Sequence, residues 1–423
     1  MEGKRRWIEL GKDALIALLA LSAAGLLTMT PLVRDSGLWG ASPEAPAAGR
    51  EDEAPLTAAA YPSRLALTGP GGRYGVQYQQ EEVDALFAQV GPLLGEALAS
   101  AGQPQRIQEA DWRGLLQGEG VYFDFSGYIP LSALAGWLRQ GADCPLEGSA
   151  RRIALARGED DGVLLCYQEQ DGGFYACATQ LSARLHLAPA TAQAEGNGAL
   201  FAFEWGEAAG LLDPYTLITE GGKSRVYAAS TPVTAGSDLT ELLDTLSFNA
   251  TNHTAISGGE VYLEGEDRLE VRHNGTVIFR AGQPGRYPAA RRGERATLAE
   301  GIELARQLAE GTVGAWCGQA RLHLSRVEET AEGWLIQFSY QLEGAGVWLY
   351  QDGWAAQFLI QDDCVTQFTL RFRSYTDTGE QALLLPVDRA AALLPGLEGA
   401  GGELVIQYRD QGEGTVEPMW VVR

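Results

Sequence analysis

The stretch EVYLEGEDRLEVRHNGTVIFRAG, from Glu260 to Gly282, alternates apolar and polar side chains in short runs separated by Gly, Asp and Asn. A period of two is typical of β-strands with one face buried. The pair Asn274-Gly275 favours a two-residue type I′ turn between LEVRH and TVIFR. The stretch therefore predicts an antiparallel β-meander.

Similar runs occur on both sides of this meander, at residues 151–156, 163–169 and 174–180 and from QARLHLSRV to the long CVTQFTLRFRSYT. Helical periodicity appears in EEVDALFAQVGPLLGEALAS, where we expect a kink at Gly91-Pro92, and again from about 296 to 309. Antiparallel strands interrupted by amphipathic helices predict an α+β fold of curved antiparallel sheets with helices packed on one face.

The N-terminal region contains a candidate membrane anchor. Residues 14–33, ALIALLALSAAGLLTMTPLV, carry no charge and are long enough to cross a hydrocarbon layer of about 30 Å as one helix. Basic residues precede this run, so residues 1–13 should form a cytoplasmic tail and the rest of the chain should be extracytoplasmic. A cleaved signal peptide with SAAG as its small-residue region is the alternative, but the apolar run continues beyond SAAG to Val33 and favours an uncleaved anchor.

The rest of the chain divides by composition. Residues 34–60 are rich in Ala, Pro and acidic residues without apolar periodicity, and they predict a flexible stalk. We expect an α-rich N-terminal module at 61–141, a middle α+β domain containing the meander at 142–290, and a C-terminal α+β domain at 291–423.

Charge and motifs exclude several classes of function. The chain has 32 Lys and Arg against 55 Asp and Glu, a formal charge of −23, which disfavours a nucleic-acid partner. It contains no GxSxG, HExxH, P-loop or dinucleotide fingerprint, so the sequence predicts no catalytic, cofactor-binding or metal-binding residues and no enzymatic activity. A secreted hydrolase whose carboxylates come from distant segments stays an alternative.

The pentapeptide ARLHL occurs twice, at 183–187 and 320–324, and contains two of the four histidines. Alternation places Leu on one face and His on the other, so we expect both copies to be half-buried strands. They are a candidate duplicated sheet element, with chance identity of five residues as the alternative. This interpretation puts His186 and His323 on the solvent face, where neither is needed for function.

Two of the five cysteines form a predicted pair. A two-residue turn at Asp171-Gly172 would place Cys166 opposite Cys177, and an extracytoplasmic location would permit a disulfide between them. The pair would occupy a hydrogen-bonded site, where side chains lie farther apart, so free thiols stay the alternative.

Small residues follow one stripe of the predicted membrane helix. Ala17, Ala20, Ala24 and Gly25 recur at spacings that let a second helix approach closely. They are the candidate helix-packing face, although alanine is common throughout this chain.

Several long segments resemble the YycH family. They run from YPSRLALTGPGGRYGVQYQQ through GVYFDFSGYIPLSALAGWL, from DPYTLITEGG to the meander, and from GAGVWLYQDGW to VEPMWVVR. YycH proteins are membrane-anchored accessory regulators of the WalK/WalR two-component system, and the last segment is similar to the PepSY-like C-terminal module that they share with YycI. The resemblance rests on apolar patterns, and five cysteines are more than the family leads us to expect.

The resemblance implies a single-pass membrane protein without a cofactor that modulates a WalK-like sensor histidine kinase of the cell envelope, with a YycI-like protein as a second partner. An envelope protein that binds peptides or cell-wall fragments is the alternative. An exposed groove lined by Trp348, Tyr350 and Trp354 would favour that alternative, whereas burial of these aromatic residues would not.

Overall fold

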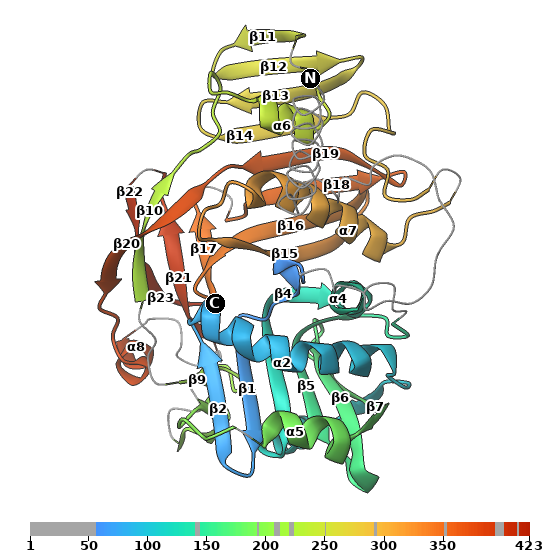
Figure 1. The fold of residues 1–423 in the computed structure, drawn as a ribbon, viewed down its shortest axis with the longest axis vertical. Coiled ribbons are helices and arrows are strands. Elements are labelled where there is room, and N and C mark those ends of the chain that lie inside the picture. The colour runs from blue at the N-terminus through green and yellow to red at the C-terminus, as the bar shows by residue number, and fades with distance from the viewer. Residues whose placement is uncertain are drawn as a thin grey trace, which may run out of the picture. The chain divides into compact units, whose positions relative to one another are not determined.

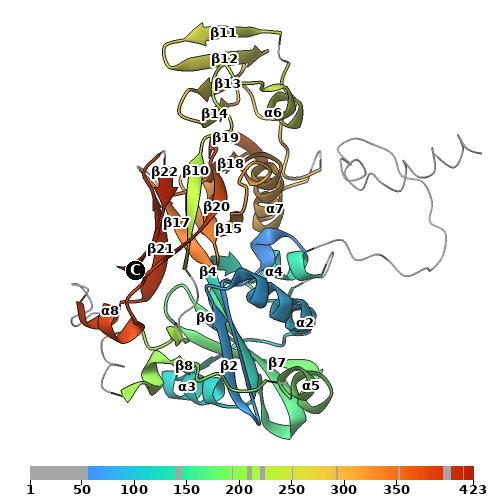
Figure 2. The ribbon, with the colours of Figure 1, turned by 60° about the vertical axis from the view of Figure 1, so that its left-hand side comes forward.

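The fold consists mainly of antiparallel β-sheets, which are joined through shared hydrophobic cores (Figures 1 and 2). The computed structural model describes residues 56–139, 144–192, 194–206, 212–219, 224–249, 251–291, 294–350, 353–393, 402–412 and 414–423. The predicted cytoplasmic tail, membrane helix and most of the stalk lie outside these ranges.

The N-terminal half contains a seven-stranded sheet in the order β2-β1-β4-β5-β6-β7-β3. Its strands are β1 (Arg64–Gly69), β2 (Gly72–Gln77), β3 (Gln105–Ile107), β4 (Gly120–Pro130), β5 (Ser149–Arg157), β6 (Gly162–Glu169) and β7 (Phe174–Ser182). The predicted strands at 151–156, 163–169 and 174–180 are thereby confirmed.

Both faces of this sheet are covered. Helices α2 (Gln80–Ala99) and α4 (Leu131–Leu138) lie over the face that presents Phe123 and Leu165. Helix α3 (Glu109–Gln117) and the short strands β8 (Leu200–Phe201) and β9 (Leu217–Ile218) cover the opposite face, where Trp112 is fully buried. The expectation of helices on one face is therefore wrong for this sheet, because alternate residues of β4 to β6 are apolar on both sides.

The hairpin between β6 and β7 overturns the predicted pairing of Cys166 with Cys177. Cys166 lies opposite Ala176, and Cys177 lies opposite Leu165. The connection is a three-residue loop that ends at Gly172 with φ of 83°. A shift of one residue in strand register moves side chains to the other face of the sheet. Cys166 and Cys177 therefore pack into different cores, and both are free thiols.

The two ARLHL segments have different structures, so they are not a duplicated sheet element. Residues Ala183–Leu187 form a π-helical turn that continues into α5 (Ala188–Thr191). The Ser182 hydroxyl accepts a hydrogen bond from the Leu185 amide at 3.3 Å, which begins this turn. The second copy opens β15 (Arg321–Thr330), where pairing with β16 (Gly333–Leu342) holds it extended.

The C-terminal half contains an eleven-stranded sheet in the order β11-β12-β13-β14-β19-β18-β16-β17-β21-β23, with β15 paired to β16. Its other strands are β11 (His253–Ile256), β12 (Gly259–Glu264), β13 (Asp267–Arg272), β14 (Thr276–Arg280), β17 (Ala345–Leu349), β18 (Ala356–Gln361), β19 (Cys364–Arg371), β21 (Leu404–Asp410) and β23 (Pro418–Val422). Strands β17 and β21 pair in parallel, and the other pairs are antiparallel.

The predicted meander is confirmed, but its turn at Asn274-Gly275 has three residues instead of two. Val271 pairs with Val277, which leaves His273, Asn274 and Gly275 in the loop. Only Gly275 has a positive φ, 79°, whereas a type I′ turn requires positive φ at both central residues.

Helices α6 (Thr240–Thr245) and α7 (Leu298–Ala309) pack on one face of the eleven-stranded sheet, as Figure 1 shows. Here the expected arrangement of helices on one face holds. A three-stranded sheet of β20 (Ser374–Ala382), β10 (Ser224–Ser230) and β22 (Gly414–Val416) flanks the large sheet, and α8 (Val387–Leu393) follows β20.

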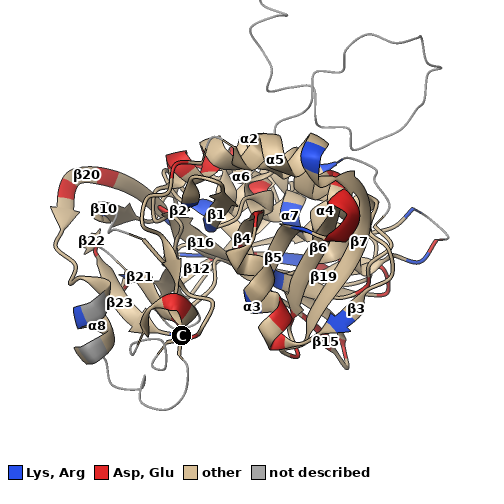
Figure 3. Cartoon of the chain, turned by 90° about the horizontal axis from the view of Figure 1, so that it is seen from below, with Lys and Arg blue, Asp and Glu red and all other residues tan. Residues whose placement is uncertain are grey.

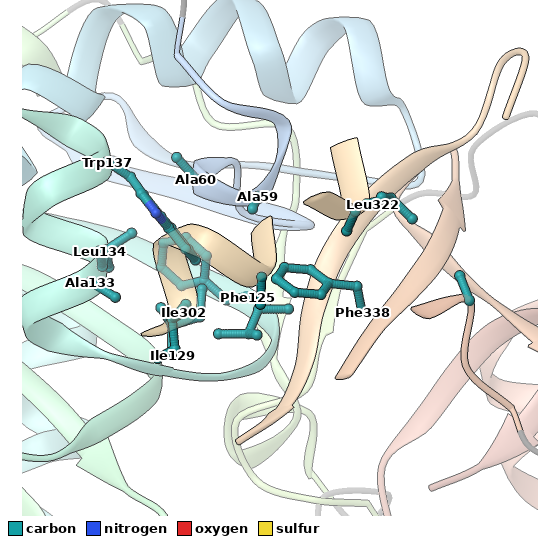
Figure 4. Close-up of a cluster of buried hydrophobic side chains, with 14 of the residues drawn as sticks. Ala59, Ala60, Phe125, Ile129, Ala133, Leu134, Trp137, Ile302, Leu322 and Phe338 are labelled. Atoms are coloured by element: carbon teal, nitrogen blue, oxygen red, sulfur yellow. The ribbon is translucent and has the colours of Figure 1, made fainter. Parts of the chain in front are cut away.

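The sheets cross the predicted domain boundaries. Strand β4 pairs with β5 across the boundary at 141, and β14 pairs with β19 across the boundary at 290. A common core joins the two halves (Figure 4), and its side chains come from β4, α4, α7, β15 and β16, including Phe125, Trp137, Ile302, Leu322 and Phe338. Residues 55–423 accordingly form one compact unit.

The stalk ends earlier than predicted. Residues Ala58–Ala60 form a 3-10 turn, η1, in which Ala59 and Ala60 are buried in the common core. The Thr57 hydroxyl contacts Glu310, and Arg306 donates to Thr57 at 3.1 Å. The chain is therefore fixed to the fold from about Leu56 onward, not from Tyr61.

Candidate functional site

Two polar centres stand out among the described residues. One is a pocket between strand ends, and the other is a buried ionic cluster that joins the two large sheets. The candidate helix-packing face, Ala17, Ala20, Ala24 and Gly25, lies outside the described residues. Within the ranges that the structure covers, no helix is long and apolar enough to cross a membrane.

The pocket, here called the Arg373 pocket, has a volume of about 640 Å³. It opens where β10, β17, β19 and β21 end and β14 begins, on the side of the fold where Figures 1 and 2 show β10, β17 and β21 together. Its lining contains Ser230, Thr231, Thr234, His273, Asn274, Thr276, Leu349, Tyr350, Arg371, Phe372, Arg373, Asp410 and Gln411.

A buried ion pair fixes one wall of this pocket. Arg373 Nε and Nη2 donate to the two carboxylate oxygens of Asp410 at 2.7 and 3.0 Å, and the residues are 7% and 2% exposed. Asp410 also accepts from the Tyr375 hydroxyl and from the Gly412 amide, each at 2.8 Å. These bonds use both oxygens of the carboxylate, so Asp410 serves to orient Arg373.

Tyr375 keeps its proton in this environment. Burial, followed by the neighbouring Asp410 charge, raises the pKa of the phenol well above its usual value of 10. The hydroxyl therefore remains a donor to Asp410 at physiological pH.

Of the three aromatic residues whose exposed groove would favour a ligand-binding protein, only Tyr350 lines this pocket. Tyr350 lines the pocket and is 69% exposed. Trp354 lies against the guanidinium of Arg371, which is 3.6 Å from the centre of its ring, and Arg371 in turn lines the pocket. Trp348 is 49% exposed but is not part of the lining, so the three aromatic residues do not share one surface.

The carboxylate of Asp410 is already engaged. Its oxygens accept from Arg373, Tyr375 and Gly412, and it is the one carboxylate among the described lining residues. These described residues alone do not make the pair of carboxylates that a glycoside hydrolase uses. What the lining offers is two guanidinium groups, several hydroxyl and amide groups, and one exposed phenol.

The second centre is the ionic cluster formed by Arg64, Asp124, Arg151, Arg152 and Glu403. Asp124 accepts from Arg64 and Arg151, each at 2.9 Å. Glu403 accepts from the same two arginines at 2.6 and 2.5 Å. All five residues come from β1, β4, β5 and the residue preceding β21, so the cluster joins the N-terminal sheet to the C-terminal strands.

Electrostatics keep Glu403 ionised. Burial opposes the charge of Glu403, but Arg151 and Arg64 outweigh it and hold the pKa of this carboxyl well below its usual range. A buried set of this kind is strongly destabilised when one partner is removed. We therefore assign it to holding the sheets together.

The prediction that both ARLHL histidines face solvent is wrong for His323. Its Nδ1 is buried and has no hydrogen-bond partner among the described residues. Burial, with a smaller effect of the Arg423 charge, lowers the pKa of His323 to about 3. The other copy, His186, accepts from the Ser182 amide at 3.2 Å and is half-buried.

Sequence reasoning did not find Arg373, Asp410 or the ionic cluster. The run CVTQFTLRFRSYT reads as one continuous strand, whereas the structure breaks it between Arg371 and Ser374 and turns Arg373 inward. The only local signal was a pair of arginines in an apolar strand, and their partners lie far away in the sequence.

Comparison with solved structures shows a likeness in fold to the crystal structure of YycH from Bacillus subtilis. The TM-score is 0.57, with 12% identity, over 87% of this chain and 95% of that chain. No family model matches the sequence. No curated protein matches it either. The chain therefore has a YycH-like α+β fold.

Proposed function

We propose that this chain is an accessory regulator of a sensor histidine kinase in a cell-envelope two-component system. The observation that carries the proposal is the YycH-like fold, which extends over 87% of the chain. Acidic residues occur in α2 and β20 (Figure 3), and Glu81, Glu96 and Glu380 among them are exposed. This acidity agrees with a protein partner in preference to a nucleic acid.

The proposal includes the location and partners that the resemblance implies. Residues 14–33 form a single membrane-spanning helix, residues 1–13 are cytoplasmic, and the remainder is extracytoplasmic. A WalK-like kinase and a YycI-like protein are the partners, and the C-terminal strands with α7 correspond to the PepSY-like module. The protein acts by contact and not by catalysis, in keeping with the occupied carboxylate of the Arg373 pocket.

The role of the chain is tested with a transcriptional reporter of the response regulator in cells that lack the protein. We expect reporter output to change when the gene is removed and to return when the full chain is restored. Unchanged output under envelope stress and in unstressed cells would contradict the regulatory function.

The membrane helix is tested separately by Ala20→Ile with Ala24→Ile, because isoleucine side chains on this stripe would hold a second helix away. We expect less kinase to co-purify from membranes and reporter output to change. Leu18→Ile with Leu21→Ile is the matched control on the surface rich in leucine. If the alanine variant and an unrelated anchor both regulate like the parent, the helix serves only as a tether.

A further inference from the structure

The open face of the eleven-stranded sheet contains a hollow. Helices α6 and α7 cover the other face (Figure 1), where Ile336, Phe358 and Phe368 are buried. Alternate side chains of the same strands point away from these helices. They line a hollow of about 460 Å³, here called the Gln357 hollow, within the range of roughly 300–1,000 Å³ typical of small-molecule sites. Its lining comprises the turn at 330–332 and five strand residues, Leu335, Gln357, Leu359, Gln367 and Thr369.

Strand register arranges the five strand residues of the Gln357 hollow in two rows. Leu335 of β16 lies opposite Leu359 of β18, which in turn lies opposite Gln367 of β19. In the next row, Gln357 lies opposite Thr369. Neighbouring strands are about 4.8 Å apart, so the two leucines form an apolar strip directly beside the three polar side chains.

The polar side chains of the hollow have unused hydrogen-bonding groups. Gln337 Nε2 donates to Gln357 Oε1 at 2.7 Å, which leaves the amide N–H groups of Gln357 as donors. No described residue forms a hydrogen bond with the side chains of Gln367 and Thr369, and both side chains are half-buried. The structure describes β15, β16, β18 and β19 throughout, so the neighbours of these groups on their own strands are known.

The charge of the hollow favours an uncharged ligand. Among its described lining residues, Glu332 is the one charged side chain, and it is exposed on the turn between β15 and β16. An anion would find no cation among these residues to offset the repulsion of a chain with a formal charge of −23. A cation would lose water without gaining a buried carboxylate in return.

From these observations we infer that the Gln357 hollow binds a small uncharged ligand that carries a secondary amide next to a methyl group. The amide of Gln367 has both a donor and an acceptor to pair with the C=O and N–H of such a ligand, and Leu335 and Leu359 offer apolar surface to the methyl group. An N-acetylated sugar and an uncharged peptide both present this chemistry. Binding to the purified chain requires no kinase, so its failure would leave the proposed regulatory role untouched.

The test is a titration of the purified full chain, followed by ligand-observed NMR, with diacetylchitobiose, cellobiose and acetyl-dialanine amide. Cellobiose is the matched control for diacetylchitobiose, because it has hydroxyl groups where the latter has acetamido groups. We expect saturable binding of diacetylchitobiose and at least about threefold weaker binding of cellobiose, which leaves the glutamine amides unpaired. Binding of acetyl-dialanine amide without diacetylchitobiose would identify a peptide as the source of the amide. Cellobiose binding as tightly as diacetylchitobiose, or binding of no probe, would overturn the inference.

Variants locate the site. Gln367→Leu removes the amide at nearly constant size, and we expect it to weaken binding of the amide probe at least about threefold. The matched control is Gln381→Leu, at an exposed glutamine of β20 outside the described lining, which should leave binding unchanged. Thr369→Val should weaken binding about twofold, and it tests the same site even if Gln367→Leu fails to fold. Equal affinity in the parent, Gln367→Leu and Thr369→Val proteins would place the ligand elsewhere and overturn the assignment.

Discussion

The ionic cluster makes a quantitative prediction for Asp124→Asn. The substitution keeps the size of the side chain but removes a charge that is fully buried and contacts Arg64 and Arg151 at 2.9 Å. Removing one partner of a buried ion pair costs about 3–5 kcal/mol, because the remaining charges stay desolvated. Glu403 would then be the one carboxylate that contacts both arginines.

The corresponding change in melting temperature follows from the size of the folded unit. An unfolding entropy of about 2.1 cal/mol/K per residue gives roughly 0.8 kcal/mol/K for the unit Pro55–Arg423. The expected decrease in Tm is therefore about 4–6 °C. Thermal unfolding of the purified full chain, followed by circular dichroism at pH 7.5, measures it.

The matched control is Glu328→Gln, which removes one partner of the exposed pair with Arg326, whose side chains are 57% and 43% exposed. Exposed pairs contribute about 0–1 kcal/mol, so the control should change Tm by no more than about 1 °C. If Asp124→Asn shifts Tm no more than the control does, the cluster does not hold the sheets together and the reasoning fails.

Three other predictions concern His323, Gly275 and the cysteines. His323 has a pKa of about 3 in the folded chain against an ordinary value of 6.5, so the unfolded chain takes up the proton first and acidification below about pH 6.5 destabilises the fold. His323→Gln should show a smaller decrease in Tm between pH 7.5 and 5.0 than the parent, and equal decreases would contradict the burial of this ring. Gly275→Ala should lower Tm, because φ is 79° and the added Cβ would lie 2.3 Å from a methyl group of Thr231; an unchanged Tm would show that the hairpin tip can move. Cys166 and Cys177 should both be alkylated after denaturation without reductant, and recovery of a disulfide between them would show that the observed strand register is wrong.

Local patterns were sufficient for most of the strands and helices. Apolar alternation located β15 to β19, and the helical spacing of Val83, Phe87, Val90 and Leu94 located the buried face of α2. These features depend on neighbours within a few residues, so sequence alone contains the necessary information.

The predictions that were wrong concern features that depend on distant partners or on single dihedral angles. Identical ARLHL segments became a π-helical turn and a strand, because the first is capped by Ser182 and the second pairs with β16. Both glycine hairpins gained one loop residue because Gly172 and Gly275 alone adopt positive φ in their loops. Because of the extra loop residue, Cys166 and Cys177 lie on opposite faces of their sheet.

Local sequence patterns could not predict the two polar centres, because these centres also depend on distant partners. Arg64 meets Glu403 across 339 positions of sequence, and Arg373 meets Asp410 across 37. Only the pairing of strands brings these groups together. The sequence showed the aromatic residues near the pocket but not the guanidinium groups beside them.

Photocrosslinking in native membranes tests the central proposal most directly. A photoreactive residue placed at exposed positions of the full chain, such as Leu185 and Leu383, should capture neighbouring proteins in living cells, and mass spectrometry identifies them. The proposal predicts that a sensor histidine kinase is captured from at least one position and that the capture disappears when the unlabelled chain is present in excess. Capture of no histidine kinase from positions distributed over the whole surface would contradict it.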